Sequence, residues 1–347
     1  MKEFNLGQIK PVSSGKKPKD IVRPTYSKDD VVLVIDGDIL AYKVSAAVED
    51  RYVTITNSKG DTRDFQTKTK FKEWCKSKGK SFDDYSLEEK QSAESIEFCL
   101  GTLKRAITNV MNKVGTNKIE IYVEGIGNFR KELPLIDLYK DREGTLRPIH
   151  LKACKQYLID WQGAVAVDGR ETDDFFQQRL YELHLDGIKA IGYSNDKDSK
   201  QEYRYDITLF NPDHNEVKTY KGGVGELWES SNGIKGSGLV WLCFQCLLFD
   251  KIDSYCMNQF YTKRYGEKSF FKDFKDLKTE NDVLSKAVEK LKLLLPEKIE
   301  YIDCFGKKQG HNWLSLTELY FQCCYMKVKD NDNTTFESLL KEYGVEY

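Results

Sequence analysis

An unbroken run of apolar residues, Val31 to Ile35, constrains the fold more than any other feature of the chain. Most of these residues are β-branched, and such a run is typical of a strand buried on both faces of a sheet. The run ends in Asp36-Gly37-Asp38, and the segment "ILAYKVSAAV" that follows directly has a helical pattern. A buried strand that leads into a helix predicts an α/β fold.

The same alternation continues along the chain. "KIEIYVEG" and "IKAIGYSNDKD" contain further buried strands, while the segments 95–113 and 149–161 and the segment that begins "RETDD" are predicted helices. "RYVTITNSKGDTRDFQTK" predicts a hairpin, and residues 68–92 are charged and loosely patterned. We therefore expect a mostly parallel central sheet flanked by helices over residues 30–225 and a helical, Lys-rich region over residues 226–347.

The first 29 residues are predicted to form a flexible basic arm. Residues 1–28 carry seven Lys and Arg against two acids and are rich in Pro, Gly and Ser. Neither a secretory signal nor a membrane span is expected, because no apolar run approaches the roughly 20 residues that a span needs. Nine scattered cysteines fit reduced thiols in a cytoplasm. The formal net charge of −1 does not exclude a nucleic-acid partner, since an acidic centre and a basic surface cancel in the sum.

Acidic residues follow each predicted strand of the sheet. Asp36 and Asp38 follow the first strand, Glu124 the second, and Asp196 and Asp198 the third. Ligands of open α/β sheets bind beyond the carboxyl ends of the strands, so we expect these side chains to meet at one edge. The helix that begins at "ETDD" adds three more acids at that edge, namely Glu171, Asp173 and Asp174.

Such a group of carboxylates repels itself unless cations are bound within it. Hard oxygen ligands with no nearby His or Cys favour Mg²⁺ or Mn²⁺ over Zn²⁺, and two ions roughly 4 Å apart would support phosphodiester hydrolysis. Each motif also has a structural explanation, because Thr172 is a good helix N-cap and the helix dipole favours acids in a first turn. Their coincidence at one sheet edge favours the metal site.

Five motifs in chain order resemble those of the phage 5′–3′ exonuclease and flap endonuclease family: "VLVIDGD", "VEGIGNFRKEL", "YKDR", "ETDD" and "NDKD". The likeness is strongest to the exonucleases of podophages, and it covers roughly residues 30 to 275. The bacterial polymerase 5′-nuclease domain is a more distant relative. The resemblance implies a PIN-like fold with two Mg²⁺ ions, for which Mn²⁺ can substitute, and the cytoplasm of a host cell if the chain is phage-encoded.

The resemblance also implies roles for the acids. Asp36 matches the first metal-binding aspartate of the family, with Asp38 as a supporting acid, and Glu124 stands where most members have Asp. The central acidic motif and the pair that completes the second metal site are matched by Glu171, Asp173, Asp174, Asp196 and Asp198. Asp36 and Asp174 are expected to be essential for turnover.

"YKDR" resembles the stretch in which a Lys and an Arg reach the scissile phosphate. It points to Lys140 and Arg142 as catalytic cations and to Tyr139 as a base-stacking surface. A cation facing an acidic site would neutralise the phosphate in the transition state, whereas a solvated basic loop is the alternative. Arg130 and Lys131 are further candidates for the same role.

In the family, a helix–turn–helix variant with two aspartates grips the duplex. "FDKIDSY" keeps Asp250 and Asp253 at the matching spacing, but Phe249 replaces the expected glycine and the glycine-rich turn is missing. Glycines let backbone amides approach phosphates closely, so their absence argues against a potassium-bridged grip. Side chains that could replace this grip are Lys263, Arg264 and Lys268.

The expected function is that of a Mg²⁺-dependent 5′–3′ exonuclease or flap endonuclease acting by a two-metal mechanism. Its partners would be duplex DNA with a 5′ end or flap, RNA primers in hybrids, and replication proteins, with no membrane. One alternative is a haloacid-dehalogenase-type phosphatase with Asp36 as nucleophile and Asp38 as general acid. The other is a nuclease-like protein that binds nucleic acid without cleaving it.

Overall fold

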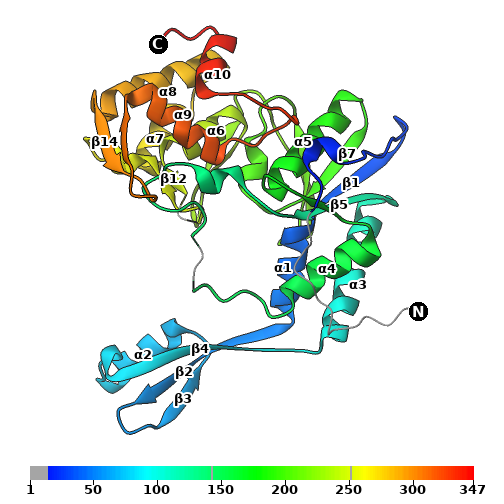
Figure 1. The fold of residues 1–347 in the computed structure, drawn as a ribbon, viewed down its shortest axis with the longest axis vertical. Coiled ribbons are helices and arrows are strands. Elements are labelled where there is room, and N and C mark those ends of the chain that lie inside the picture. The colour runs from blue at the N-terminus through cyan, green and yellow to red at the C-terminus, as the bar shows by residue number, and fades with distance from the viewer. Residues whose placement is uncertain (1–14, 142–143, 251) are drawn as a thin grey trace.

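The centre of the molecule is a six-stranded sheet with the strand order β6-β5-β1-β7-β8-β9 (Figure 1). The structure is a computed structural model that describes residues 15–141, 144–250 and 252–347. The strands from β6 to β8 are parallel, and β9 at the edge is antiparallel. The strand bounds are Val31–Asp36 for β1, Lys118–Glu124 for β5, Val165–Val167 for β6, Lys189–Tyr193 for β7, Ile207–Asn211 for β8 and Glu216–Tyr220 for β9. The predicted mostly parallel α/β sheet is thereby confirmed.

Helices cover both faces of this sheet. The central strand β1 pairs with β5 and β7, which places Leu33 opposite Ile119 and Ile191. One face packs against α1 (Gly37–Ala47), α3 (Ile96–Val114) and α4 (Leu151–Gln162), and the other packs against α5 (Thr172–Leu185). Because β1 is covered on both sides, its residues from Val32 to Ile35 are fully buried.

The C-terminal region forms a second, largely helical lobe beside the sheet (Figure 1). Its core is α6 (Gly238–Leu247), which is buried along its whole length and so explains the continuous apolar run in the sequence. The surrounding helices are α7 (Glu267–Phe274), α8 (Glu280–Leu294), α9 (Trp313–Cys324) and α10 (Phe336–Glu342). Three strand pairs complete the lobe: β10 (Glu226–Ser230) with β11 (Gly233–Ser237), β12 (Phe249–Asp250) with β13 (Tyr255–Cys256), and β14 (Ile299–Ile302) with β15 (Lys308–His311).

Residues 49–93 form a small subdomain between α1 and α3, which we call the insert. It consists of β2 (Glu49–Asn57), β3 (Thr62–Phe65), α2 (Lys68–Lys78) and β4 (Tyr85–Ala93). The predicted hairpin is confirmed as β2 and β3, whereas the loosely patterned stretch 68–92 folds into α2 and β4. Figure 1 shows the insert projecting away from the sheet and its helices.

The N-terminal segment differs from the predicted arm where the structure describes it. Residues 1–14 lie outside the described residues. From residue 15 onward the chain packs against the protein: Lys16 bridges to Val167, and Ile21 is buried on the sheet face that carries α5. Arg23 pairs with Glu182 and with Asp330, so residues 15–29 are fixed by long-range contacts.

No helix within 15–141, 144–250 or 252–347 combines the length and the apolar character that crossing a membrane requires.

Candidate metal centre

A cleft of about 690 Å³ opens at the carboxyl edge of the central sheet. The strands β1, β5 and β7 end there, and helix α5 begins there. Six of the acids named from the sequence line this cleft, and we call them the cleft acids: Asp36, Asp38, Glu124, Glu171, Asp173 and Asp196. Side chains that are far apart in the sequence thus share one cavity.

Asp36 is the N-cap of α1 as well as a wall of the cleft. Its Oδ1 accepts hydrogen bonds from the backbone N–H groups of Asp38 and Ile39, at 2.9 and 3.0 Å. Within the described residues, no hydrogen bond occupies its Oδ2. Burial, together with the charges of Asp38 and Asp196, raises the pKa of Asp36 to about 8. A carboxylate in this position would be stabilised by a cation.

Asp38 connects three elements at the cleft. Its Oδ2 accepts from the backbone N–H of Glu124 at 2.8 Å and from the hydroxyl of Thr172 at 2.7 Å, and its Oδ1 is paired with Lys155 of α4. Thr172 is therefore not the N-cap that the sequence suggested. Glu171 occupies the N-cap position without a side-chain cap, and the Thr172 hydroxyl orients Asp38 instead.

Lys140 faces the acids at the start of α5 from the cleft wall. Its Nζ lies 2.5 Å from Glu171 and 3.6 Å from Asp253, and its backbone has a φ of +51°, which is uncommon for a residue other than glycine. Burial alone would lower the pKa of Lys140, but the charges of Asp173, Glu171 and Asp253 raise it above its ordinary value. Lys140 is therefore a permanent positive charge facing the cleft acids.

A second acidic group, which we call the buried aspartate cluster, consists of Asp198, Asp250 and Asp253. One carboxylate oxygen of each lies within 4.8 Å of the other two, and all three residues are buried. Asp250 pairs with Lys197, and Gln245 donates to Asp198. Burial raises the pKa of Asp198 well above its usual range and that of Asp253 to about 6. The sequence grouped Asp198 with Asp196; the structure joins Asp198 to the two aspartates assigned to the duplex grip.

Asp174 does not line the cleft, in contrast to the other acids of its motif. It is fully buried, and Arg130 donates to both of its oxygens, at 2.6 and 2.9 Å. Arg130 is fully buried as well and also donates to the backbone carbonyls of Cys323 and Tyr325. Burial alone would raise the pKa of Asp174, but Arg130 holds it below the usual value. The structure therefore presents neither Asp174 nor Arg130 to a substrate.

The remaining candidates lie in three different settings. Tyr139 is buried, and its hydroxyl donates to Glu171 at 3.1 Å, so its ring is not exposed for stacking on a base. Lys131 lines the cleft as a basic residue. Arg142 lies outside the described residues. The predicted duplex-contacting side chains are exposed around the start of α7 and do not line the cleft: Lys263, Arg264 and Lys268.

Several cleft residues were missed from the sequence: Lys43, Asn128, Arg147 and Lys155. Lys43 and Lys155 belong to α1 and α4, and nothing in the sequence of these helices shows that either lysine faces a cleft. Asn128 follows β5, and its Oδ1 accepts from the backbone of Arg130, which leaves its buried Nδ2 without a partner in the described residues. An unpaired buried donor in a cleft wall is suited to a ligand oxygen.

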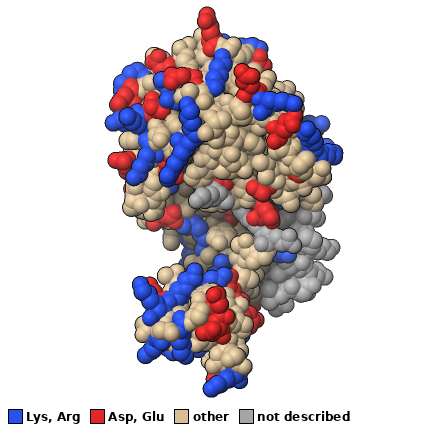
Figure 2. Space-filling model, turned by 90° about the vertical axis from the view of Figure 1, so that its left-hand side faces the viewer, with Lys and Arg blue, Asp and Glu red and all other residues tan. Residues whose placement is uncertain are grey.

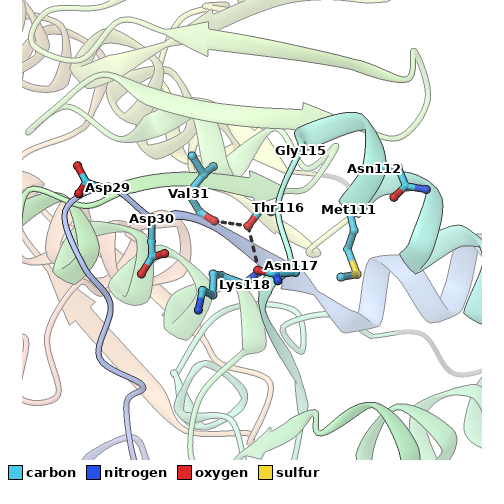
Figure 3. Close-up of a pocket in the computed structure, with 9 residues that line it drawn as sticks. All are labelled: Asp29, Asp30, Val31, Met111, Asn112, Gly115, Thr116, Asn117 and Lys118. Atoms are coloured by element: carbon cyan, nitrogen blue, oxygen red, sulfur yellow. Dashed lines mark hydrogen bonds between the residues drawn. The ribbon is translucent and has the colours of Figure 1, made fainter.

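A second hollow, of about 610 Å³, lies at the opposite edge of the sheet (Figure 3). Thr116 there ties β1 to β5, since its hydroxyl donates to the Val31 carbonyl and accepts from the Lys118 backbone at 3.0 Å. The acids of this hollow are Asp29 and Asp30, and no group of three possible metal ligands includes them among the described residues. We assign the hollow a structural role.

The donor chemistry at the carboxyl edge fits divalent metal ions. Asp198, Asp250 and Asp253 offer converging oxygens in a buried setting, and no histidine or cysteine in the described part of the chain lines the cleft. All-oxygen ligand sets favour Mg²⁺, Mn²⁺ or Ca²⁺. Burial, and after it the charges of neighbouring carboxylates, raise the pKa of Asp36 and of Asp253, so a bound cation would favour the ionised form of each. A metal ion could therefore be held here.

Comparison with known proteins finds similarity in structure and not in sequence. No protein-family model matches the chain, and no curated protein matches it significantly. A crystal structure of the T5 D15 protein, co-crystallized with metal ions, matches 90% of this chain and 98% of that chain, with a TM-score of 0.45 and 11% sequence identity. A similarity this low carries no argument by itself, so the function is inferred from the residues of this chain.

Proposed function

We propose that the protein is a Mg²⁺-dependent nuclease that hydrolyses DNA phosphodiesters as a 5′–3′ exonuclease or flap endonuclease. The observation that carries the proposal is the meeting of carboxylates from β1, β5, β7 and α5 in one cleft, above the buried aspartate cluster. The five family-like motifs supply most of these carboxylates. RNA primers hybridised to DNA are a further substrate, because phosphate contacts do not depend on the sugar.

The buried aspartate cluster would hold one ion, because one oxygen each of Asp198, Asp250 and Asp253 lies within 4.8 Å of the other two. A second ion would be held by Asp36, Asp173 and Asp196 from the cleft walls. Among the described residues these three carboxylates do not lie that close together, so their side chains would have to draw together around the ion. Bound there, Mg²⁺ or Mn²⁺ would activate a water and stabilise the charge of the phosphate.

The chain itself contributes donors around the substrate. Lys140 would neutralise the phosphate from the side of α5, and Lys131 would do so from the segment after β5. The unpaired Nδ2 of Asn128 would donate to a phosphate oxygen. Lys155 and Thr172 would hold Asp38 in place rather than touch the substrate.

A cleavage assay with 5′-labelled duplex DNA tests the proposal. With Mg²⁺ we expect release of nucleotides or short products that carry a 5′-phosphate, and with EDTA we expect none. Binding without Mg²⁺-dependent release would instead support the non-catalytic alternative. Hydrolysis of a small phosphomonoester with a phospho-aspartate trapped at Asp36 would support the phosphatase.

Replacing Lys140 with alanine should slow cleavage by about 100-fold, because one preorganised cation facing the reacting phosphate is lost. The affinity for Mn²⁺, measured by calorimetry, should not weaken, since the substitution removes a positive charge from beside Glu171 and Asp253. A matched control is Lys104→Ala, which removes an exposed lysine of α3 outside the cleft. An unaltered cleavage rate in Lys140→Ala would reduce this residue to a counter-ion of Glu171.

A further inference from the structure

The insert is not needed to complete the core of the sheet. Its apolar cluster consists of Val53, Ile55, Phe71 and Cys75 and shares no residue with the clusters that cover the central sheet. Aromatic residues close this small core, with Phe71 packed on Phe65 and Phe82 at centroid distances of 5.3 and 4.9 Å. Because the insert contributes no residue to the cores that cover the central sheet, its role is not to stabilise that sheet.

Helix α2 gives the insert a strongly basic surface. Five lysines and one glutamate lie within residues 68–78, and Lys80 follows the C-cap Gly79. Lys68, Lys72 and Lys76 are spaced four residues apart, an arrangement in which like charges repel one another along one side of a helix. In Figure 2 the insert is the lower part of the view, and Lys and Arg side chains gather on its upper side, toward the rest of the molecule.

Most of these cations have no acidic partner. Lys68 pairs with Glu89 and Lys70 with Glu73, but the other lysines of this surface are exposed and form no ion pair among the described residues: Lys72, Lys76, Lys78 and Lys80. Two of the four lie over aromatic rings, Lys72 over Phe82 at 5.3 Å and Lys80 over Trp74 at 4.9 Å. These contacts hold the two ammonium groups in place, whereas lysines that only keep a surface hydrated need no such contact.

The base of the insert is tied to the wall of the cleft. Gln91 donates to the carbonyl of Arg147 at 2.9 Å, and Glu49 accepts from the backbone N–H of Ile149 at 2.8 Å. Arg147 itself lines the cleft, as do the two residues before it. The basic surface is therefore held in a defined position relative to the cleft acids.

We propose that the α2 face of the insert binds the phosphate backbone of duplex DNA whose end lies in the cleft. The inference rests on the proposed nuclease function and identifies where the substrate extends. Helix α1 spans about 16 Å. The part of β2 from Glu49 to Val53, which packs with Phe71 of α2, adds about 16 Å at roughly 3.3 Å per residue. Along this path the α2 face lies on the order of 30 Å from Asp36. Duplex DNA rises about 3.4 Å per base pair, so the contact falls roughly nine base pairs from the cleft.

The test compares DNA binding by the wild-type protein and a variant with Lys72, Lys76, Lys78 and Lys80 changed to alanine. Fluorescence anisotropy with EDTA present would use a duplex of about 30 base pairs and a hairpin with a stem of about 6 base pairs. We expect about tenfold weaker binding of the long duplex and a salt slope lower by about 3.6, since each of the four phosphate contacts contributes about 0.9. The short hairpin, which cannot reach the insert, should bind both proteins alike.

The matched control removes four lysines from elsewhere: Lys104, Lys113, Lys118 and Lys189. They lie on α3 and at the starts of β5 and β7, and the two strand starts mark the edge opposite the cleft. Equal losses in control and test variants, or equal losses on the two DNA lengths, would overturn the proposal. Mg²⁺-dependent cleavage of the short hairpin by the wild-type protein is measured in parallel, so that a failed nuclease function is distinguished from a failed role of the insert.

Discussion

Replacing Asp36 with asparagine is expected to lower turnover by about 10³-fold or more while the protein stays folded. Asparagine keeps the oxygen that accepts from Asp38 and Ile39 and is as good an N-cap as aspartate, so α1 should be retained. What is lost is the negative charge at the centre of the cleft acids, and preorganised charge is usually the largest contribution to catalysis of this kind. Steady-state cleavage of labelled duplex DNA measures the loss.

The same substitution should change how stability depends on pH. The pKa of Asp36 is raised to about 8, above the value of about 4 expected in the unfolded chain. Between these two values the folded protein binds the proton more tightly than the unfolded protein does, so stability falls as pH rises through this window. In EDTA, the melting temperature of the wild-type protein should fall more steeply from pH 5 to 8 than that of Asp36→Asn.

A buried acid outside the cleft serves as the control. Asp303 accepts backbone hydrogen bonds in the turn between β14 and β15, and its pKa is lowered rather than raised. Asp303→Asn should keep the turnover of the wild-type protein. If Asp36→Asn cleaved DNA at the wild-type rate, Asp36 would have no role in the chemistry, and the proposed nuclease centre would have to be abandoned.

The central sheet could be predicted because its strands carry the strongest local signal in the chain. The run from Val31 to Ile35 has no polar interruption. A strand that is apolar on both faces must lie inside a sheet that helices cover on both sides. The meeting of Asp36, Glu124 and Asp196 followed from the same reasoning, because the carboxyl ends of neighbouring parallel strands share one edge.

The contacts of Asp174 and Asp198 could not be predicted, because both are set by partners far away in the sequence. Arg130 lies 44 residues before Asp174, and Gln245 lies 47 residues after Asp198. The motif "ETDD" gives its last two residues the same chemistry and adjacent positions, so only the packed structure separates Asp173 in the cleft from Asp174 in the interior. The hairpin of the insert was predicted, but α2 and β4 were not, because the core of the insert is small and polar residues stand between its apolar positions.

Replacing Asp174 with alanine is expected to destabilise the protein rather than to act first on turnover. The substitution would leave the buried Arg130 guanidinium with only its 3.2 Å contact to Glu171, and removing one partner of a buried ion pair costs about 3–5 kcal/mol. The Lys327 backbone N–H, which donates to Asp174 at 3.0 Å, would also lose its acceptor. We expect the melting temperature to fall by roughly 10 °C, which calorimetry would measure.

A double-mutant cycle identifies the ion pair as the cause. Asp174→Ala and Arg130→Ala should each be strongly destabilising, whereas the double variant should lose much less than the sum, because no buried charge is then left unpaired. Asp173→Ala is the matched control from the same helical turn. Burial and the charge of Glu171 raise the pKa of Asp173 well above its usual range, so its removal should lower turnover without lowering the melting temperature.

The two variants would therefore separate an acid with a structural role from a neighbouring acid that we propose to act in the chemistry. The family resemblance assigns Asp174 to the chemistry, and the structure assigns it to the contact between the start of α5 and the segment that follows α9. If Asp174→Ala melted with the wild-type protein and lost its turnover, the resemblance would be correct, and Arg130 would have to release this carboxylate during the reaction. If the losses of stability in Asp174→Ala and Arg130→Ala instead added up in the double variant, the cause would be the backbone contacts around Lys327 and not the ion pair.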